Sequence, residues 1–203
     1  MSLSSDYFER MFDASDDPWS FRTRWYEKRK RDLTLACLPK QRYQRIFEPA
    51  CANGELSALL AQRCDALLCQ DINHKAVDLA RRRLAGLAHV RIEQARMPAD
   101  WPEGTFDLIV LSEVGYFLDA REWHLVIEQA LRSLSNDGAV LACHWRHPVE
   151  GCAQNGDDVH AALADRLPMH RLVRHEEPDF LLDYWCRSPT TIDLGETFES
   201  SRV

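Results

Sequence analysis

Short apolar runs alternate with longer amphipathic stretches between residues 45 and 145. Apolar residues at helical spacing predict helices over residues 55–63, 75–85 and 121–134. The short runs predict strands over residues 45–48, 66–71, 90–93, 106–112 and 139–145, with a turn at residues 136–138 (NDG) before the last of them. Because strands that alternate with helices favour right-handed crossovers, we expect a doubly wound, mostly parallel sheet with helices on both faces.

After residue 145 the alternation gives way to a helical pattern followed by two consecutive β-type runs. The helix is expected over residues 157–167, and the runs cover residues 170–175 and 180–186. The four residues between the runs, at 176–179 (EEPD), suit an antiparallel hairpin at the edge of the sheet. With the five earlier strands, this hairpin predicts an α/β fold with a seven-stranded sheet.

The first forty residues differ in character from the rest. An acidic and aromatic turn at residues 16–19 (DDPW) precedes a stretch with helical spacing over residues 21–38. The basic run at residues 28–31 (KRKR) is most simply a solvated helix face, while the nearby tryptophans leave room for a lid over a ligand. We therefore expect an N-terminal helical lid (1–40), a ligand-binding domain (41–187) and an unstructured polar tail (188–203).

Composition and charge narrow the class of protein. With 203 residues, 45% hydrophobic and 28% charged, the chain has an average globular composition and can bury a full core. A net charge of −7 argues against binding to nucleic acid or anionic membranes by charge alone. Since neither a signal peptide nor a run of about eighteen apolar residues is present, we expect a cytoplasmic protein, either a monomer or a weak homodimer.

The seven cysteines are scattered, and none belongs to a C-x-x-C pair. This pattern predicts neither a zinc site nor a disulfide framework, and we expect no metal. Most of them lie in apolar runs, where a free cysteine behaves as a small buried hydrophobe. Cys51 is the exception, because it lies in a turn that also carries the chain's most informative motif.

That motif is the segment at residues 48–54 (EPACANG), which follows the first apolar run and opens the first helix. A carboxylate, Asp71, ends the second apolar run about seventeen residues beyond Gly54. A strand, a turn of small residues, a helix and a second strand that ends in an acid are typical of a nucleotide-binding unit. The turn brings bare backbone close to the ligand, and the acid binds the ribose hydroxyls.

The arrangement from residue 45 to residue 186 resembles class I S-adenosylmethionine-dependent methyltransferases, which implies a Rossmann-like methyltransferase fold and S-adenosyl-L-methionine as cofactor. The family pattern is an acid followed by glycines at alternate positions. Here Glu48 and Gly54 match that pattern, whereas Ala50 and Ala52 replace the earlier glycines, although alanine disfavours a positive φ. The resemblance places the cofactor on Glu48, Ala50, Cys51, Ala52, Asn53, Gly54, Asp71, Ile72, Arg96, Met97 and Ser112. Arg96 lies where the family often has an acid that binds the adenine amino group.

Four segments resemble the nodulation protein S family more closely. They are residues 17–19 (DPW), 24–30 (RWYEKRK), 111–116 (LSEVGY) and 143–148 (CHWRHP). Members of that family are N-methyltransferases that act on the free amine of a deacetylated chitooligosaccharide glucosamine. The resemblance therefore implies a small-molecule amine acceptor such as an amino sugar. Three residues of the N-terminal helix are candidates for substrate contact, or alternatively for core packing: Trp25, Tyr26 and Arg29.

Two polar clusters follow the ends of central strands, where ligands bind in a doubly wound sheet. Glu113 and Tyr116 follow one strand, and His144 and His147 follow the next, so we expect all four to line one cavity as catalytic residues. Glu113 could bind an ammonium or accept its proton, or it could instead be a carboxylate that favours a helix amino terminus. A histidine with an ordinary pKa near 6.5 could remove the proton, or could serve only as a structural hydrogen-bonding group.

The sequence thus favours an N-methyltransferase acting on a small polar amine, with an oxygen or sulfur acceptor as an alternative. The two glycine replacements leave open a module that binds S-adenosylmethionine without catalysis. A nicotinamide-dependent oxidoreductase shares the strand-turn-helix-acid unit, but residues 50–54 lack the G-x-G-x-x-G spacing of that class.

Overall fold

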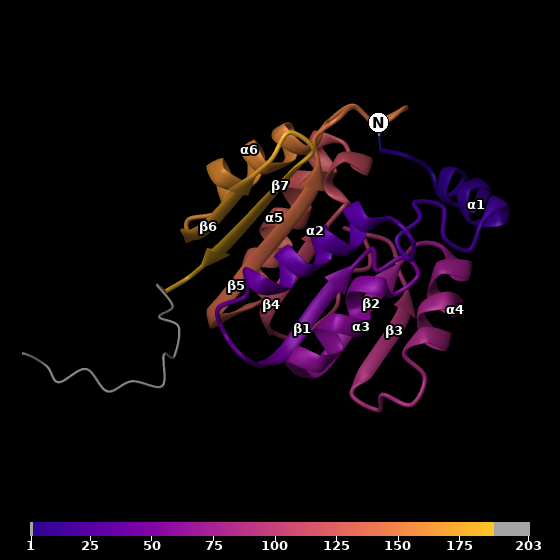
Figure 1. Cartoon of the computed structure of the whole chain (residues 1–203). Helices are drawn as coiled ribbons and strands as arrows, with labels where there is room; N and C mark the ends of the chain where they lie inside the picture. The colour runs from indigo at the N-terminus through magenta and orange to yellow at the C-terminus, as the bar shows by residue number, and fades with distance from the viewer. Residues whose placement is uncertain (1, 189–203) are drawn as a thin grey trace, which may run out of the picture.

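The computed structural model describes residues 2–188, so the predicted polar tail lies outside the described residues from 189 onward. A seven-stranded sheet with the order β3-β2-β1-β4-β5-β7-β6 forms the centre of the molecule (Figure 1). Its strands are β1 (Tyr43–Pro49), β2 (Cys64–Asp71), β3 (Val90–Gln94), β4 (Phe106–Ser112), β5 (Leu134–Trp145), β6 (His170–Glu176) and β7 (Phe180–Cys186). Strands β1 to β5 pair in parallel, while β7 runs antiparallel to both β5 and β6. The doubly wound sheet with an antiparallel edge hairpin, predicted from the sequence, is confirmed.

Helices cover both faces of this sheet. They are α1 (Ser5–Ala14), α2 (Trp25–Ala36), α3 (Glu55–Leu60), α4 (His74–Arg83), α5 (Ala120–Ser133) and α6 (Gly156–Arg166), with short 3-10 turns η1 (Ala61–Arg63) and η2 (Gly115–Phe117). Residues of α3 and α4 pack into one hydrophobic cluster, and residues of α5 and α6 pack into another. Neighbouring strand residues point to opposite clusters, as Ile46 and Phe47 of β1 do, because side chains alternate along a strand.

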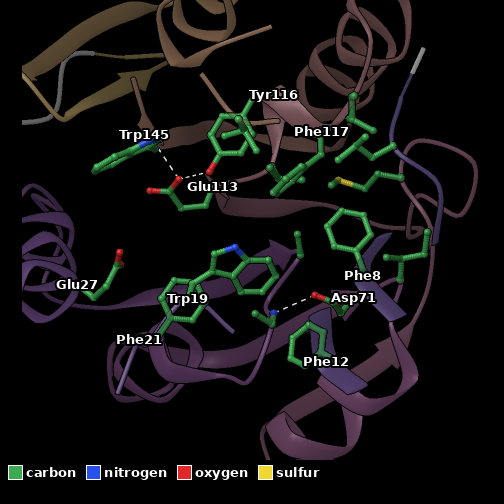
Figure 2. A pocket seen from close by; sticks show the side chains of 18 of the residues that line it. Phe8, Phe12, Trp19, Phe21, Glu27, Asp71, Glu113, Tyr116, Phe117 and Trp145 are labelled. Carbon is green, nitrogen blue, oxygen red and sulfur yellow. Dashed lines mark hydrogen bonds between the residues drawn. The ribbon is translucent and has the colours of Figure 1, made fainter. Parts of the chain in front are cut away.

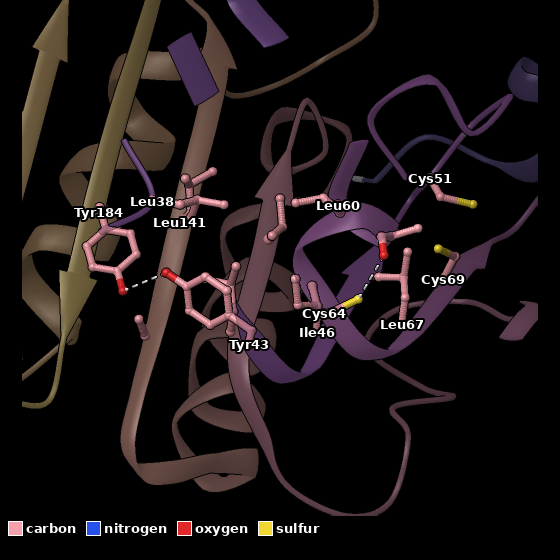
Figure 3. Close-up of a cluster of buried hydrophobic side chains, with 14 of the residues drawn as sticks. Leu38, Tyr43, Ile46, Cys51, Leu60, Cys64, Leu67, Cys69, Leu141 and Tyr184 are labelled. Atoms are coloured by element: carbon pink, nitrogen blue, oxygen red, sulfur yellow. Dashed lines mark hydrogen bonds between the residues drawn. The ribbon is translucent and has the colours of Figure 1, made fainter. Parts of the chain in front are cut away.

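The first of these clusters shows how a parallel strand is buried. Its members from β1, β2 and β4 are almost fully buried, and Tyr43 reaches across to Tyr184 of β7, with the two hydroxyl oxygens 3.3 Å apart (Figure 3). Cys51, Cys64 and Cys69 belong to the same cluster as small apolar side chains. Because β4 is buried on both faces, its sequence is a nearly continuous apolar run, which explains why this strand is predicted with its observed bounds, Phe106–Ser112.

Two local features differ from the sequence-based expectations. The helix predicted over residues 55–63 ends at Leu60 and continues as the 3-10 turn η1. The turn predicted at residues 136–138 lies inside β5, where the register against β4 shifts, since Leu134 pairs with Phe106 and Ala139 pairs with Leu108. The polar tripeptide is thus accommodated as an irregularity within a strand.

The N-terminal segment also differs from its prediction. The helix predicted from residue 21 begins at Trp25, because residues before it form a loop in which the Asp17 carboxylate accepts hydrogen bonds from the backbone N–H groups of Phe21 and Arg22 at 2.9 and 3.0 Å. A further helix, α1, precedes this loop and was not predicted. Helix α2 lies over one face of the sheet (Figure 1), where Leu33 packs against Cys143 of β5 and Leu182 of β7.

Candidate active site

A cavity of about 490 Å³ lies at the carboxyl ends of β1, β2, β4 and β5. The parallel strands supply its floor, including Asp71 on one side and Glu113 on the other (Figure 2). The N-terminal segment supplies much of the opposite wall through its aromatic side chains: Phe8, Phe12, Trp19, Phe21 and Tyr26. The cavity is therefore enclosed by residues from distant parts of the chain.

The turn after β1 has the backbone conformation that the family motif requires, although it has lost two glycines. Ala50, Ala52 and Gly54 all have positive φ values, at 57°, 48° and 78°. For an L-residue this left-handed conformation costs about 1–2 kcal/mol, so the surrounding structure must hold both alanines in place. At Gly54 an added Cβ would lie 3.1 Å from the Cα of Ala80, so glycine also permits the close approach of α4.

Asp71 joins this turn to the end of β2. One carboxylate oxygen accepts the N–H of Ala52 at 2.9 Å, and the other accepts the N–H of Asn73 at the same distance (Figure 2). Burial raises the pKa of Asp71 to about 6, against the opposing effect of these backbone hydrogen bonds. The side chain is thus fixed by backbone donors and lines the cavity.

Glu48 lies behind the turn and differs in charge from Asp71. It is 3% exposed, and its carboxyl accepts a weak hydrogen bond from the Cys69 thiol at 3.5 Å. Burial raises its pKa to about 8, so this group is mostly protonated at neutral pH. It lines a small recess of about 60 Å³ that opens beside the main cavity.

The residues expected to hold a cofactor are distributed over these two spaces. Ala50, Ala52, Asp71, Ile72, Arg96 and Met97 line the large cavity. Glu48, Cys51, Asn53 and Ser112 line the small recess, together with both alanines. Gly54 lines neither space and packs against α4. Ten of the eleven predicted positions therefore lie at one of the two spaces.

Glu113 is the centre of a polar cluster on the other side of the cavity. One of its carboxylate oxygens accepts a hydrogen bond from the Lys30 ammonium at 2.6 Å. The other accepts the backbone N–H of Trp145 at 3.1 Å and the hydroxyl of Tyr116 (Figure 2). A carboxylate has about four lone-pair positions, so these three donors leave one for a group in the cavity. Burial, with Glu113 beside it, raises the pKa of Tyr116 well above its usual value, so the hydroxyl remains a donor.

The position of Lys30 corrects the expectation that the basic run of α2 is solvated. Its side chain is 6% exposed and lies between two carboxylates, with the ammonium 2.6 Å from Glu113 and 3.0 Å from Glu27. The same ammonium lies 5.0 Å from the centre of the Tyr26 ring. Burial alone would lower the pKa of Lys30, but the adjacent Glu113, aided by Cys143 and Glu27, raises it. Lys30 is therefore a charged group of the cavity wall.

The expectation that four residues line one cavity is correct for Glu113 and Tyr116 and wrong for the two histidines. His144 is fully buried behind the cavity wall, where its Nε2 accepts the N–H of Gly115 at 3.1 Å. Burial lowers the pKa of His144 well below 6.5, so its imidazole is neutral. His147 lies outside the cavity with half of its side chain exposed, and its Nε2 is 2.8 Å from the carboxylate of Asp179.

Of the three candidate substrate contacts on α2, only Tyr26 lines the cavity. Its ring packs edge-on against Trp145, with 5.4 Å between the ring centres. Trp25 is 70% exposed and does not line the cavity, and Arg29 forms a bidentate pair with Glu177 at 2.6 and 2.8 Å. Trp25 and Arg29, four residues apart, share a face of α2 that does not line the cavity, whereas Tyr26 and Lys30 share the face that does.

Sequence reasoning missed the aromatic residues of α1 and the following loop. Phe8 and Phe12 are four residues apart and therefore share one face of α1, and that face lines the cavity. Two polar contacts also hold this segment in place. Asn53 of the turn donates to the Asp17 carboxylate at 3.0 Å, and Lys75 of α4 donates to the Phe12 carbonyl at 2.6 Å. The spacing of the two phenylalanines was the signal that could have identified the helix.

Two further searches concern residues 2–188 only. Within that range no helix is long and apolar enough to cross a membrane. The same residues contain no group of three or more His, Cys, Asp or Glu side chains that could hold a metal ion.

The strand order, the turn after β1 and the acid that ends β2 define the fold of class I S-adenosylmethionine-dependent methyltransferases. The family model described as Nodulation protein S (NodS) matches residues 3–172. The chain therefore belongs to the nodulation protein S family, as the resemblance of its four segments predicted.

Curated relatives agree with this assignment. The chain is 33% identical to nodulation protein S of Rhizobium tropici over 130 residues, which are 63% of this chain and 55% of the relative. It is 28% identical to nodulation protein S of Bradyrhizobium diazoefficiens over 156 residues, which are 76% of this chain and 72% of the relative. The chain thus spans little more than half the length of the Rhizobium protein.

Solved structures show the same fold. A crystal structure of a candidate methyltransferase from Pseudomonas syringae is 59% identical, with a TM-score of 0.73, and covers 81% of this chain and 100% of its own. The N-methyltransferase NodS from Bradyrhizobium japonicum WM9, in complex with S-adenosyl-L-homocysteine, is 23% identical with a TM-score of 0.79. That comparison covers 89% of this chain and 96% of the Bradyrhizobium chain.

Proposed function

We propose that this chain transfers the methyl group of S-adenosyl-L-methionine to a nitrogen atom of a small polar amine. The observation that carries the proposal is the presence, in one cavity, of a ribose-type acid, Asp71, and a separate polar cluster around Glu113. A related chain of the same fold is named an N-methyltransferase and binds S-adenosyl-L-homocysteine, the product that methyl transfer leaves behind.

The residues around Asp71 suit the proposed cofactor. Its carboxylate retains lone pairs beyond the two backbone hydrogen bonds and can accept from the ribose hydroxyls. Ile72 and Met97 line the same part of the cavity and offer apolar contact to an adenine ring. The small recess beside the turn, with the side chains of Asn53 and Arg31 at its wall, offers polar contacts for the amino-acid end.

When bound, S-adenosylmethionine supplies a methyl group that is already activated by its sulfonium. The nitrogen–carbon bond would form as the carbon–sulfur bond breaks, the sulfur would keep the electron pair, and the resulting ammonium would release its proton to water. The protein mainly aligns the two reactants, and such orientation can lower the barrier by about 7–11 kcal/mol. Glu113 has one lone-pair position free to accept an N–H of the amine, and thereby orients its nitrogen lone pair.

We further propose an amino sugar as the acceptor and the N-terminal segment as a lid. Tyr26 and Trp145 form an aromatic corner of the cavity beside Glu113, and aromatic faces pack well against sugar rings. Residues 3–30 contribute much of the wall opposite the strands, which is the position of a cover over bound ligands. The Bradyrhizobium japonicum relative is described as an N-methyltransferase, which supports a nitrogen acceptor and specifies no sugar.

The test follows a labelled methyl group from S-adenosylmethionine into a panel of acceptors. The panel contains glucosamine oligomers with a free amine, the fully N-acetylated oligomers as matched controls, simple amines, alcohols and thiols. We expect label in the free amines and none in the acetylated controls. Tight binding of the cofactor by calorimetry without transfer to any acceptor would instead support a binding module, and label in alcohols or thiols would move the acceptor atom to oxygen or sulfur.

A further inference from the structure

Three buried polar side chains form a continuous hydrogen-bonded row behind the cavity wall. His144 of β5, His160 of α6 and Asp183 of β7 are 0%, 2% and 0% exposed. The Nδ1 of His144 lies 3.1 Å from the Nε2 of His160, and the Nδ1 of His160 lies 2.6 Å from a carboxylate oxygen of Asp183. We propose that His144, supported by His160 and Asp183, is a positioning residue that holds the backbone N–H of Gly115 and thereby places Glu113 and Tyr116 at the cavity.

The position of each proton in this row can be deduced from the contact with Gly115 at one end. A backbone N–H can only donate, so the Nε2 of His144, 3.1 Å from the Gly115 nitrogen, must be an acceptor without a proton. Because His144 is neutral, its single proton is on Nδ1 and points to the Nε2 of His160. The proton of His160 is then on its Nδ1 and points to Asp183. Each donor in the row thus has one acceptor.

The segment that the row holds is the one that carries the acceptor cluster. Gly115 stands between Glu113 and Tyr116, and an added Cβ there would lie 2.4 Å from a methyl carbon of Val159 and 3.2 Å from the Nε2 of His144. Glu113 itself has a φ of 56°, a left-handed conformation that a side chain other than glycine adopts only when its surroundings hold it. The segment is therefore tightly packed against both α6 and β5.

Three successive residues of β5 contact this segment. The Cys143 carbonyl accepts the N–H of Glu113 at 2.8 Å, the His144 ring accepts the N–H of Gly115, and the Trp145 N–H donates to the Glu113 carboxylate at 3.1 Å. The first and third contacts use backbone atoms of β5 and are available to any residue. The middle contact needs a side chain that can accept a hydrogen bond from Gly115. The row to Asp183 keeps the proton of His144 on Nδ1 and so leaves Nε2 as the acceptor.

A purely space-filling role fits these observations less well. Burying a carboxylate such as Asp183 is costly unless it is paired, and apolar side chains of similar size would fill the same volume without that cost. Its second oxygen has no hydrogen bond, and the nearest cations, Arg171 and Arg174, lie 3.9 Å from the carboxylate. A row that ends on a carboxyl group and has one allowed proton order is suited to fixing a tautomer. This proposal depends on the proposed function only for the role of Glu113.

The first test needs no activity and no variant. Nitrogen-15 NMR of the full-length protein, with labelled histidine, distinguishes the two ring nitrogens of each imidazole. We expect His144 and His160 both to carry the proton on Nδ1, with their Nε2 atoms unprotonated. A proton on the Nε2 of His144 would overturn the proposal, whatever the enzyme methylates.

The second test compares two substitutions, one that removes the hydrogen-bond acceptor and one that keeps it. In His144→Gln the side-chain oxygen can still accept from Gly115, whereas His144→Phe keeps the ring and loses the acceptor. We expect His144→Phe to lower kcat by about tenfold, as for one ordinary hydrogen bond, and to leave the KM for S-adenosylmethionine unchanged. His144→Gln should recover most of kcat, and the Gly115 amide proton should shift upfield only in the Phe variant.

The outcomes separate this proposal from the proposed function. Equal kcat in both variants and in the unchanged protein would overturn the positioning role even if methyl transfer is confirmed. The protein could instead transfer no methyl group to any acceptor and still have the expected tautomers and the amide shift in His144→Phe alone. In that case the hydrogen bond that holds Gly115 would be supported and the proposed function would be wrong. If His144→Phe does not fold, the tautomer measurement on the unchanged chain still decides.

Discussion

The two sides of the cavity hold their carboxylates in different ways. Asp71 accepts two backbone N–H groups from residues 19 and 2 positions away in the chain. Glu113 accepts a donor from Lys30, 83 residues away, and the N–H of Trp145, 32 residues away, besides its near neighbour Tyr116. One side is thus built by a local turn between adjacent strands, and the other by contacts among separate elements.

This difference shows what each side tolerates. A backbone donor remains when a side chain changes, so the turn keeps its conformation even with alanine at two positions of positive φ. The Glu113 cluster depends on particular side chains, since removing Lys30 would leave the buried Glu27 and the partly buried Glu113 without their cation. We expect the cofactor side to be robust to substitution and the acceptor side to be sensitive.

The largest effect is expected at Glu113. Glu113→Gln keeps the size of the side chain but replaces one acceptor oxygen by a donor that faces other donors. If Glu113 accepts the amine N–H and so orients the nitrogen, we expect kcat to fall by about 10²-fold. The affinity for S-adenosylmethionine, measured by calorimetry, should stay within about twofold of the original value, because that side is held independently.

The matched control, Tyr116→Phe, removes one of the three donors to Glu113 and should lower kcat by about tenfold or less. A parallel loss of cofactor affinity in Glu113→Gln would show that the two sides are not independent.

The next effect is expected at Asp71 and concerns binding. Asp71→Asn removes a charge-assisted contact to the ribose hydroxyls and should weaken the affinity for S-adenosylmethionine by about 10- to 100-fold. Since the pKa of Asp71 is raised to about 6, the affinity of the unchanged protein should also fall as the pH drops below that value and the carboxyl gains a proton. Calorimetric titrations over a series of pH values measure both. The Asn variant should lack this step, and an unaltered affinity in it would place the ribose elsewhere.

A stability effect is expected from Glu48. Its pKa rises from 4.5 in the unfolded chain to about 8 in the folded protein because of burial, so between these values the folded state binds more protons. The free energy of unfolding should therefore decrease as the pH rises from about 4.5 to about 8. Asp71 contributes in the same direction only up to its own pKa of about 6, and the lowered pKa of His144 acts in the opposite direction up to its usual value of 6.5, so Glu48 is isolated only above both values.

The measurement is denaturant unfolding at several pH values, and Glu48→Gln is the comparison. The variant should have a flatter dependence on pH above about 6.5, since glutamine does not titrate. If the two proteins have the same dependence there, the buried carboxyl is not the group that titrates.

The smallest effect is expected at the turn itself. Ala52→Gly relieves a positive φ of 48° but increases the freedom of the unfolded chain, so the free energy of unfolding should rise by up to about 1 kcal/mol. Ala58→Gly in α3 is the matched control, and there the same change should lower the free energy of unfolding by about 1 kcal/mol. Equal signs for the two substitutions would contradict strain in the turn.

The same contrast explains which parts were predictable from the sequence. The strand–turn–acid unit is local, so its spacing placed Asp71 and the alanines correctly at the cavity. The sheet was predictable because its apolar runs and helices alternate regularly. Glu113 and Tyr116 were predictable because the ends of parallel strands meet at one edge.

Other features depend on distances that a sequence pattern does not contain. The burial of Lys30 follows from the docking of α2 over β4, and a basic run is ordinarily solvated, so the prediction was wrong. His144 lies within β5 and is buried behind the cavity wall, whereas His147 follows the end of this strand and is half exposed. The aromatic wall from α1 required knowledge of where the N-terminal segment lies.

Lys30, Glu113 and Trp145 are far apart in the sequence, and this separation determines when the acceptor side can form during synthesis. A ribosome releases α2 first, β4 much later and β5 later still, while the turn between β1 and β2 is complete before β4 exists. Closing long stretches of chain precedes the gain from non-local contacts, so the local side forms early and the non-local side late. The acceptor pocket is thus absent from any nascent chain that ends before Trp145, and only a chain that contains β5 can hold both reactants.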